Sequence, residues 1–111
     1  MSGIKVNGLD QLNAKLRKNM DPNVVKMIVR KNGADLQKKA QRYAPVATGE
    51  LKRSIGLSIK DGGMTAVVAP ATDYAEYVEY GTRFMEAQPF IRPAFGEQKQ
   101  IFIKELEKVM K

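Results

Sequence analysis

The 111-residue sequence contains no cysteine, no histidine and no tryptophan. These absences exclude zinc sites and haem ligation through Cys or His, nucleophile systems with a His base, and any disulfide framework. No apolar run approaches the roughly 18 residues needed to span a bilayer, and the N-terminal segment lacks the apolar core of a secretion signal. We therefore expect an intracellular protein without a membrane partner.

The charge is divided unevenly along the chain. The 19 Lys and Arg residues against 12 Asp and Glu give a net charge of +7. Residues 1–60 hold 13 basic and 4 acidic side chains, net +9, whereas residues 61–111 hold 6 and 8, net −2. A basic half can bind a polyanion, attract the acidic half of the same or a neighbouring molecule, or be a solvated helix face.

Local patterns predict a strand and two helices in the N-terminal part of the chain. Alternation over the first seven residues is typical of a short strand, and apolar residues at helical spacing predict a helix over 9–20. Asp21 and Pro22 are typical of a helix start, where an N-cap acceptor precedes a residue that has no N–H to satisfy. The longest helix is therefore predicted over 22–43, ending before Pro45.

A hairpin is predicted in the middle of the chain. Thr48 is the candidate N-cap of a short helical turn that ends near Ser54. A Gly-rich turn then joins strands predicted over 55–60 and 64–69.

Two helices are predicted after the hairpin. Asp73 and Glu76 have the spacing of a capping box, and Gly81 can provide a left-handed C-terminal cap. One side of this short helix carries Tyr74, Tyr77 and Val78. An exposed loop over 82–90 follows, and Pro93 opens a last helix to residue 111.

The predicted fold class is α+β in a single domain over 1–111. A small antiparallel sheet, made of the hairpin and the short N-terminal strand, is expected to pack against the long helix 22–43 and the C-terminal helix 93–111.

The carboxylates Asp73, Glu76 and Glu79 are the only acidic cluster that suggests chemistry. Together they could hold Mg²⁺ in a nuclease. Steps of three residues rotate side chains around a helix, however, and capping accounts for two of the three. We therefore expect no catalytic residue, no metal and no cofactor, and predict that the protein is not an enzyme.

Basic residues favour contact with nucleic acid. Tyr43 is the only aromatic residue near them, which gives little support for base stacking. We expect such contact to be non-specific and sensitive to salt, and a small basic nucleic-acid-binding protein is one interpretation of the chain. The candidate residues are Lys38, Lys39, Arg42, Lys52 and Arg53.

Glu79 suggests a structural ion pair. It stands next to Tyr80 and Gly81 in a helix that otherwise shows Tyr and Val, with Arg92 not far along the chain. We predict a charge-assisted pair that ties the short helix to the start of the last one.

Three ordered segments carry a family resemblance. They read A-P-x-x-T-G-x-L-x-x-S-I over 44–55, Y-A-x-x-V-E-Y-G-T over 74–82 and P-F-I-R-P-A over 89–94. These segments resemble the motifs of the head–tail connector proteins of tailed bacteriophages, also called neck or tail-completion proteins. The motif residues in this chain are Pro45, Thr48, Gly49, Leu51, Ser54, Ile55, Glu79, Gly81, Thr82, Pro89, Phe90, Arg92 and Pro93.

The resemblance implies a structural virion protein, encoded by a phage or prophage. Such a subunit forms a ring, six-fold by resemblance, at the head–tail junction and is part of the channel through which double-stranded DNA passes. Its implied partners are further copies of itself and the neighbouring head-completion, tail-terminator or tail-tube proteins.

The exposed loop over 82–90 is the expected contact between subunits of this ring. Phe84, Met85 and Phe90 would form an apolar patch that cyclic packing buries against the next subunit. The five basic candidates named above could line the channel.

Overall fold

The computed structural model describes residues 4–7, 21–45 and 49–109. The helix predicted over 9–20 and the N-cap candidate Thr48 lie outside the described residues. The elements are β1 (Ile4–Asn7), α2 (Pro22–Tyr43), α3 (Glu50–Ser54), β2 (Gly56–Lys60), β3 (Thr65–Ala69), α4 (Ala75–Tyr80) and α5 (Ile91–Val109). The predicted α+β fold class is confirmed.

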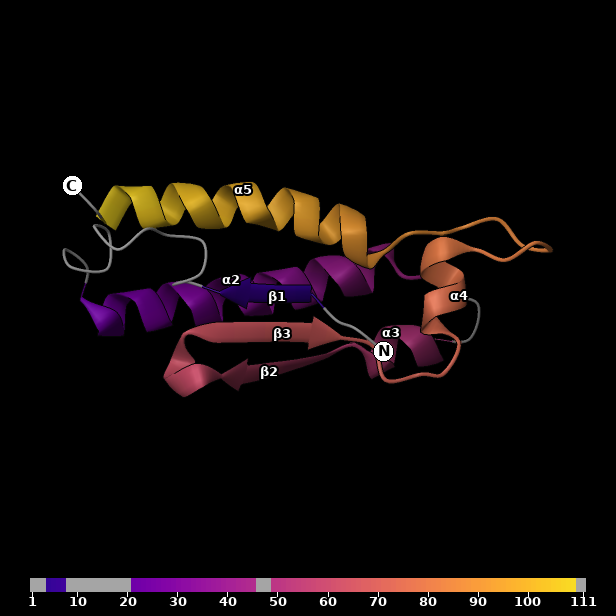
Figure 1. Cartoon of the computed structure of the whole chain (residues 1–111), viewed down its shortest axis with the longest axis horizontal. Helices are drawn as coiled ribbons and strands as arrows, with labels where there is room; N and C mark the ends of the chain where they lie inside the picture. Colours follow the sequence, from indigo (N-terminus) through magenta and orange to yellow (C-terminus); the bar gives the residue numbers. More distant parts are fainter. Residues whose placement is uncertain (1–3, 8–20, 46–48, 110–111) are drawn as a thin grey trace.

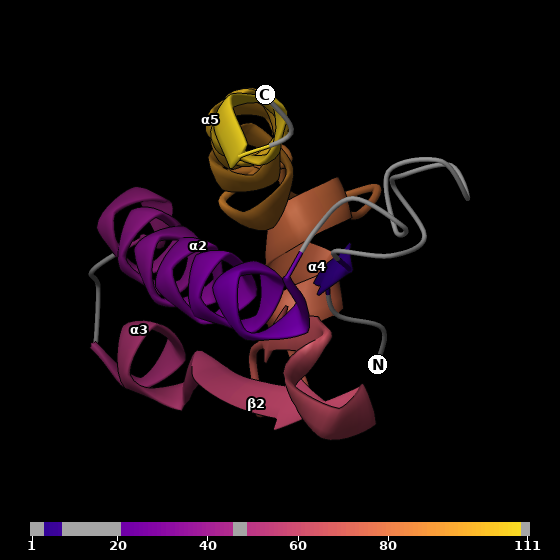
Figure 2. The same ribbon diagram turned by 90° about the vertical axis from the view of Figure 1, so that its left-hand side faces the viewer.

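The molecule is elongated, with α2 between the hairpin and α5 (Figure 1, Figure 2). The three antiparallel strands follow the order β1-β3-β2, and α5 runs antiparallel to α2. The extents are 50 × 20 × 19 Å. Helices α3 and α4 and the loop after α4 gather at one end, whereas the hairpin turn and the last turn of α5 lie at the other (Figure 1).

Helix α2 has the predicted boundaries because its signals are local. The Asp21 carboxylate accepts a hydrogen bond from the Asn23 N–H at 2.9 Å, Pro22 takes the first helical position, and the helix ends at Tyr43, shortly before Pro45. The core-forming face of α2 contributes Val25, Ile28, Val29, Leu36 and Ala40, which are all buried.

The hairpin also forms as predicted, apart from the first residue of each strand, since β3 starts at Thr65 and not at residue 64. Ile55 is buried just before β2, which starts at Gly56. Asp61 adopts a positive φ of 54° in the 3₁₀ turn that joins β2 to β3, and its carboxylate accepts a 2.6 Å hydrogen bond from the Thr65 hydroxyl. This bond links the turn to the first residue of β3.

The last two helices depart from the predicted boundaries. Helix α4 is shorter than expected, and the capping box is wrong, because its N-cap is Tyr74 without a side-chain hydrogen bond. Gly81 has the expected positive φ of 79°, but its ψ of 176° lies outside the left-handed helical region. Helix α5 begins at Ile91, two residues before Pro93.

A polar seam, defined as Asn32, Lys39, Gln98 and Glu105, joins α2 to α5. Asn32 and Gln98 are fully buried, and the Gln98 amide donates to the Asn32 side-chain oxygen at 2.5 Å. Asn32 donates to Glu105 at 3.2 Å, and Lys39 donates to the Gln98 oxygen at 2.5 Å. Because a shift along either helix would leave buried polar groups unpaired, the seam fixes the register of α5 on α2.

Gly33 allows the close approach of α2 to the sheet. A Cβ built at Gly33 would lie 2.7 Å from the Ala66 Cβ and 3.0 Å from a Leu57 methyl. At Gly96, also inside a helix, a Cβ would meet nothing within 4 Å.

We predict opposite effects of alanine at these two glycines. Gly33→Ala should lower the free energy of unfolding by about 1–2 kcal/mol, because the clash outweighs the gain in helix propensity. Gly96→Ala should raise it by about 0.5–1 kcal/mol. Urea unfolding followed by circular dichroism measures both, and equal stabilisation by the two variants would show that α2 does not pack as closely as described.

Candidate functional site

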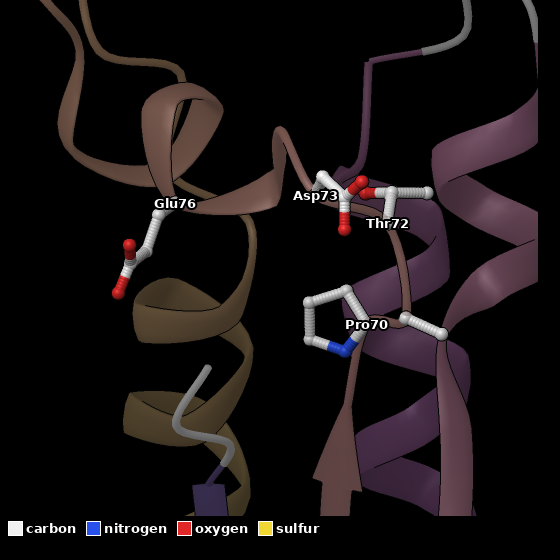
Figure 3. Close-up of a pocket in the computed structure, with 5 residues that line it drawn as sticks. Pro70, Thr72, Asp73 and Glu76 are labelled. Carbon is white, nitrogen blue, oxygen red and sulfur yellow. The ribbon is translucent and has the colours of Figure 1, made fainter.

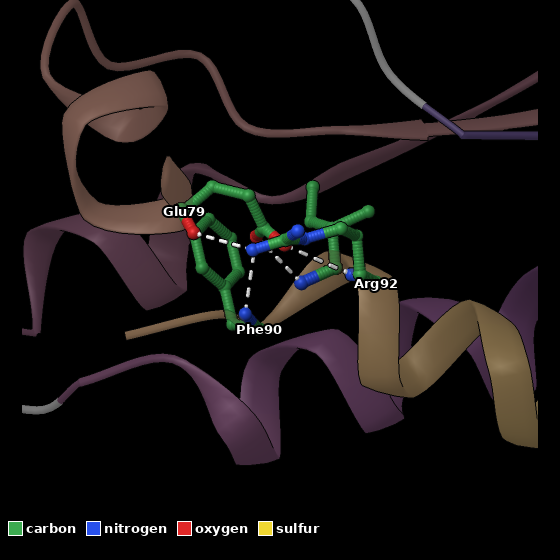
Figure 4. A network of polar contacts seen from close by, with 4 residues as sticks. Glu79, Phe90 and Arg92 are labelled. Carbon is green, nitrogen blue, oxygen red and sulfur yellow. Dashed lines mark hydrogen bonds and ion pairs between the residues drawn. The ribbon is translucent and has the colours of Figure 1, made fainter. Parts of the chain in front are cut away.

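The centre of the candidate site is the carboxylate of Glu79, which α4 turns inward. Glu79 is only 6% exposed. Its Oε1 accepts the N–H groups of Phe90 at 3.0 Å and Ile91 at 2.9 Å, and its Oε2 accepts the N–H of Arg92 at 3.1 Å. Figure 4 shows Phe90, just before α5, and Arg92, in the first turn of α5, close to the Glu79 carboxylate.

These bonds complete the N-terminus of α5. The first four N–H groups of a helix have no partner inside it, and here Glu79 accepts three of them while the fourth position is Pro93, which has no N–H. A carboxylate at this end also interacts favourably with the helix dipole. The cap therefore comes from another helix, which explains why α5 begins before the proline.

Arg92 completes the arrangement, as predicted from the sequence. Its Nε donates to Glu79 Oε2 at 3.0 Å, and its Nη2 donates to the Glu79 backbone oxygen at 3.0 Å. The guanidinium also lies 4.8 Å from the centre of the Tyr80 ring, a cation–π geometry. We call the contacts of Glu79 with residues 90–92 the Glu79 clasp.

The clasp determines the protonation of its own carboxylate. Burial alone would raise the pKa of Glu79, but the N–H groups of Ile91, Phe90 and Arg92 and the Arg92 guanidinium outweigh it and lower the pKa below its ordinary value of 4.5. Glu79 is therefore ionised at neutral pH, as a helix cap requires.

Backbone hydrogen bonds give the loop after α4 a defined conformation. The Thr82 and Met85 backbones pair, with N···O distances of 2.9 and 3.3 Å, and the Gln88 N–H donates to the Val78 oxygen at 2.8 Å. A Cβ at Gly81 would lie 2.7 Å from the backbone nitrogen of Ala87. The two sides of the loop thus touch near its base, and only a glycine fits there.

Phe84 lies at the tip of this loop with 90% of its surface exposed, next to the Arg83 guanidinium. Met85 is also exposed, as the sequence predicted for both residues. The prediction for Phe90 is wrong: it is 0% exposed and belongs to the core, because the clasp pulls the end of the loop inward.

The exposed side of α4 is aromatic. Tyr77 and Tyr80 are 57% and 63% exposed, whereas Ala75 and Glu79 form the buried side. The expected grouping of the tyrosines with Val78 is wrong, since Val78 is half-buried and packs on the core. We call the exposed set the aromatic stripe: Tyr74, Tyr77, Tyr80, Phe84 and Met85.

The sequence predicted the exposure of Phe84 and Met85 in this stripe, but not that of Tyr74, Tyr77 and Tyr80. Tyr74, Tyr77 and Tyr80 are spaced three residues apart in the sequence. This spacing would have predicted an exposed tyrosine face if Glu79 had been assigned to the buried side. In most surface helices the apolar side is buried and the charged side is exposed. In α4, by contrast, a carboxylate is buried and tyrosines are exposed.

The basic candidates divide between two helices. Lys38 and Arg42 are exposed on α2, and Lys52 and Arg53 are exposed on α3. Lys39 differs, because its ammonium is bound to Gln98 in the polar seam. Four of the five candidates thus remain available for an anion.

The motif residues around α3 have structural contacts. Leu51 and Ile55 are buried in the core, and the Ser54 hydroxyl donates to the Leu51 oxygen at 2.7 Å. The N-cap of α3 is Gly49 and not the predicted Thr48. Gly49 has a φ of 75°, a left-handed conformation that favours glycine.

The acidic cluster is not assembled into a metal site. Asp73 and Glu76 line an open hollow of about 300 Å³ with Pro70, Ala71 and Thr72, and Figure 3 shows the Glu76 carboxylate directed away from Asp73. Glu79 is engaged in the clasp. Within the described ranges, no group of three or more acidic side chains is placed to hold a metal ion, so the magnesium nuclease interpretation lacks its third ligand.

Comparison with known families identifies the family to which the chain belongs. Residues 9–81, about two thirds of the sequence, match the HK97-gp10-like family, described as "Bacteriophage HK97-gp10, putative tail-component". The chain belongs to this family and is a bacteriophage tail-related structural protein, associated with the virion. No curated protein and no solved structure matches it. None of the helices in the described part is long and apolar enough to span a membrane.

We predict that the clasp can be dissected by substitution. Glu79→Gln should destabilise the fold by about 2–4 kcal/mol, because a neutral amide replaces a buried charged acceptor of four hydrogen bonds. Arg92→Gln should cost about 1 kcal/mol, since its side chain is half exposed. A double-mutant cycle by urea unfolding should give a coupling energy between them; additive effects would contradict the pair. Glu76→Gln, on the exposed side of α4, is the matched control.

The stability should also depend on pH through Glu79. A carboxyl whose folded pKa is lowered stabilises the fold above its unfolded pKa, and this contribution disappears as the pH falls through the folded value. The difference in unfolding free energy between wild type and Glu79→Gln should therefore shrink between about pH 6 and about pH 3. A difference that stays constant over this range would mean that the pKa of Glu79 is the same in the folded and unfolded states.

Proposed function

We propose that this protein is a structural subunit that assembles into a ring at the head–tail junction of a long-tailed phage. The ring would be part of the DNA channel and would serve head–tail joining or tail completion. The family match supports a tail-related role, and the motif resemblance supports the position and a six-fold ring. The observation that carries self-assembly is the aromatic stripe, an exposed apolar surface held in a fixed conformation.

The fixed conformation matters because ordering a flexible loop on binding costs free energy. Here the backbone pairing of Thr82 with Met85 and the clasp at the base of the loop have already ordered it. Aromatic and Met side chains are enriched in protein interfaces. Phe84 is almost completely exposed in the single chain, and a large exposed apolar side chain of this kind is typical of a surface that binds a partner.

The remaining parts of the proposal concern DNA and neighbouring proteins. Of the exposed basic candidates, Lys52 and Arg53 on α3 would meet passing DNA without sequence specificity, through phosphates alone. The ring would stack on head-completion proteins on one side and on tail-terminator or tail-tube proteins on the other. The protein would work without catalysis or a cofactor.

The same exposed basic residues favour a second candidate function, a small non-specific nucleic-acid-binding protein. Such a protein would bind DNA as a monomer or dimer and would not need Phe84.

We predict that Phe84→Ser abolishes ring formation and leaves the fold intact. The substitution removes a fully exposed side chain, so the change in stability should stay within about 0.5 kcal/mol. Light scattering gives the mass in solution and negative-stain images show the rings. Ile101→Ser, at an exposed apolar residue of α5, is the control and should still assemble. A wild-type monomer whose DNA affinity depends on Lys38 and not on Phe84 would instead support the second candidate.

A further inference from the structure

We propose that the aromatic stripe of one subunit binds the exposed basic face of α2 in a second copy of this chain. The basic face is defined as Arg30, Lys31, Lys38 and Arg42, all exposed. This inference rests on the proposed self-assembly and names the two surfaces that meet.

The first argument is geometric. The loop that carries Phe84 projects from the end of the elongated molecule, beyond α4 and away from its own α2 (Figure 1). The stripe and the basic face are therefore separate surfaces of one subunit. A contact between two different surfaces is heterologous, and repetition of such a contact produces a closed ring when the rotation permits closure.

The second argument is charge. The segment 73–90, which carries the stripe, has four acidic residues against one Arg. Of these, Glu79 is neutralised by Arg92 in the clasp, whereas Asp73, Glu76 and Glu86 are exposed. Helix α2 has six Lys and Arg residues against one Asp. The two surfaces are thus oppositely charged, which favours their encounter and disfavours stripe against stripe.

The third argument is the availability of the cations. Lys38 and Arg42 make no hydrogen bond or ion pair with the other described residues, while Lys31 is shared with Glu105 at 3.1 Å. Unpaired Lys and Arg side chains bind both carboxylates and the faces of tyrosine rings. The stripe offers both kinds of group within a few residues.

Cysteine cross-linking tests the pairing directly, because the chain has no cysteine of its own. Arg83→Cys places one thiol beside Phe84 at the loop tip and keeps the phenyl ring, and Lys38→Cys places one on the basic face. In the doubly substituted chain, mild oxidation should give a ladder of disulfide-linked oligomers that ends at the ring size. Each single variant alone should give little product, and Arg83→Cys with Lys60→Cys, an exposed site in β2, is the matched control.

The outcomes separate this inference from the proposed function. Cross-linking of Arg83→Cys with itself would mean that loops meet loops and would overturn the inference. Rings that form normally without a ladder would overturn it and leave the proposed function standing. A wild-type chain that is monomeric at every concentration, together with no ladder from the doubly substituted chain, would remove both.

Charge reversal provides an independent readout. Glu76→Lys and Lys38→Glu should each weaken self-association about tenfold or more, because like charges then face each other. Combining both in one chain should recover most of the affinity, since each reversed residue meets a reversed partner on the next copy. Additive losses in the combined variant, measured by sedimentation, would overturn the pairing.

Discussion

The structure depends on one buried carboxylate. Helix α4 has six residues, too few to be stable alone, and α5 begins with backbone donors that its own sequence does not satisfy. Glu79 supports both elements at once, because it belongs to α4 and its carboxylate accepts hydrogen bonds from the N–H groups of residues 90–92 at the start of α5. The loop between them is thereby fixed at its base. Removing this charge would release three features of the fold together.

The inward direction of Glu79 determines which side of α4 faces solvent. Because the carboxylate and Ala75 occupy the buried side, the tyrosines must point outward. The same interaction draws Phe90 into the core and leaves Phe84 as the exposed aromatic residue of the loop. The surface suited to assembly is therefore a consequence of how the fold is held together.

The sequence predictions are accurate where the deciding interactions join residues close together in the chain, and wrong where these interactions join distant residues. Helix α2 and the hairpin were predicted closely because Asp21, Pro22, Pro45 and the glycines of the turn act on adjacent residues. The start of α5 was misplaced because its cap comes from a residue twelve positions earlier than Ile91. Lys39 was assigned to DNA because its partner Gln98 lies 59 residues away, and such long-range pairing leaves no local pattern.

The clasp also divides the segment after α4 into a constrained and a free part. Glu79 lies inside the family match, which ends at residue 81, whereas its partners lie beyond it. A chain that kept Glu79 but lost the residues 90–92 would bury an unpaired charge, so the two segments are physically inseparable. Between Thr82 and Gln88, by contrast, every residue is exposed and none belongs to the hydrophobic core. The tip of the loop can therefore change its contact chemistry at little cost to the fold, which is the property expected of the part that recognises a partner.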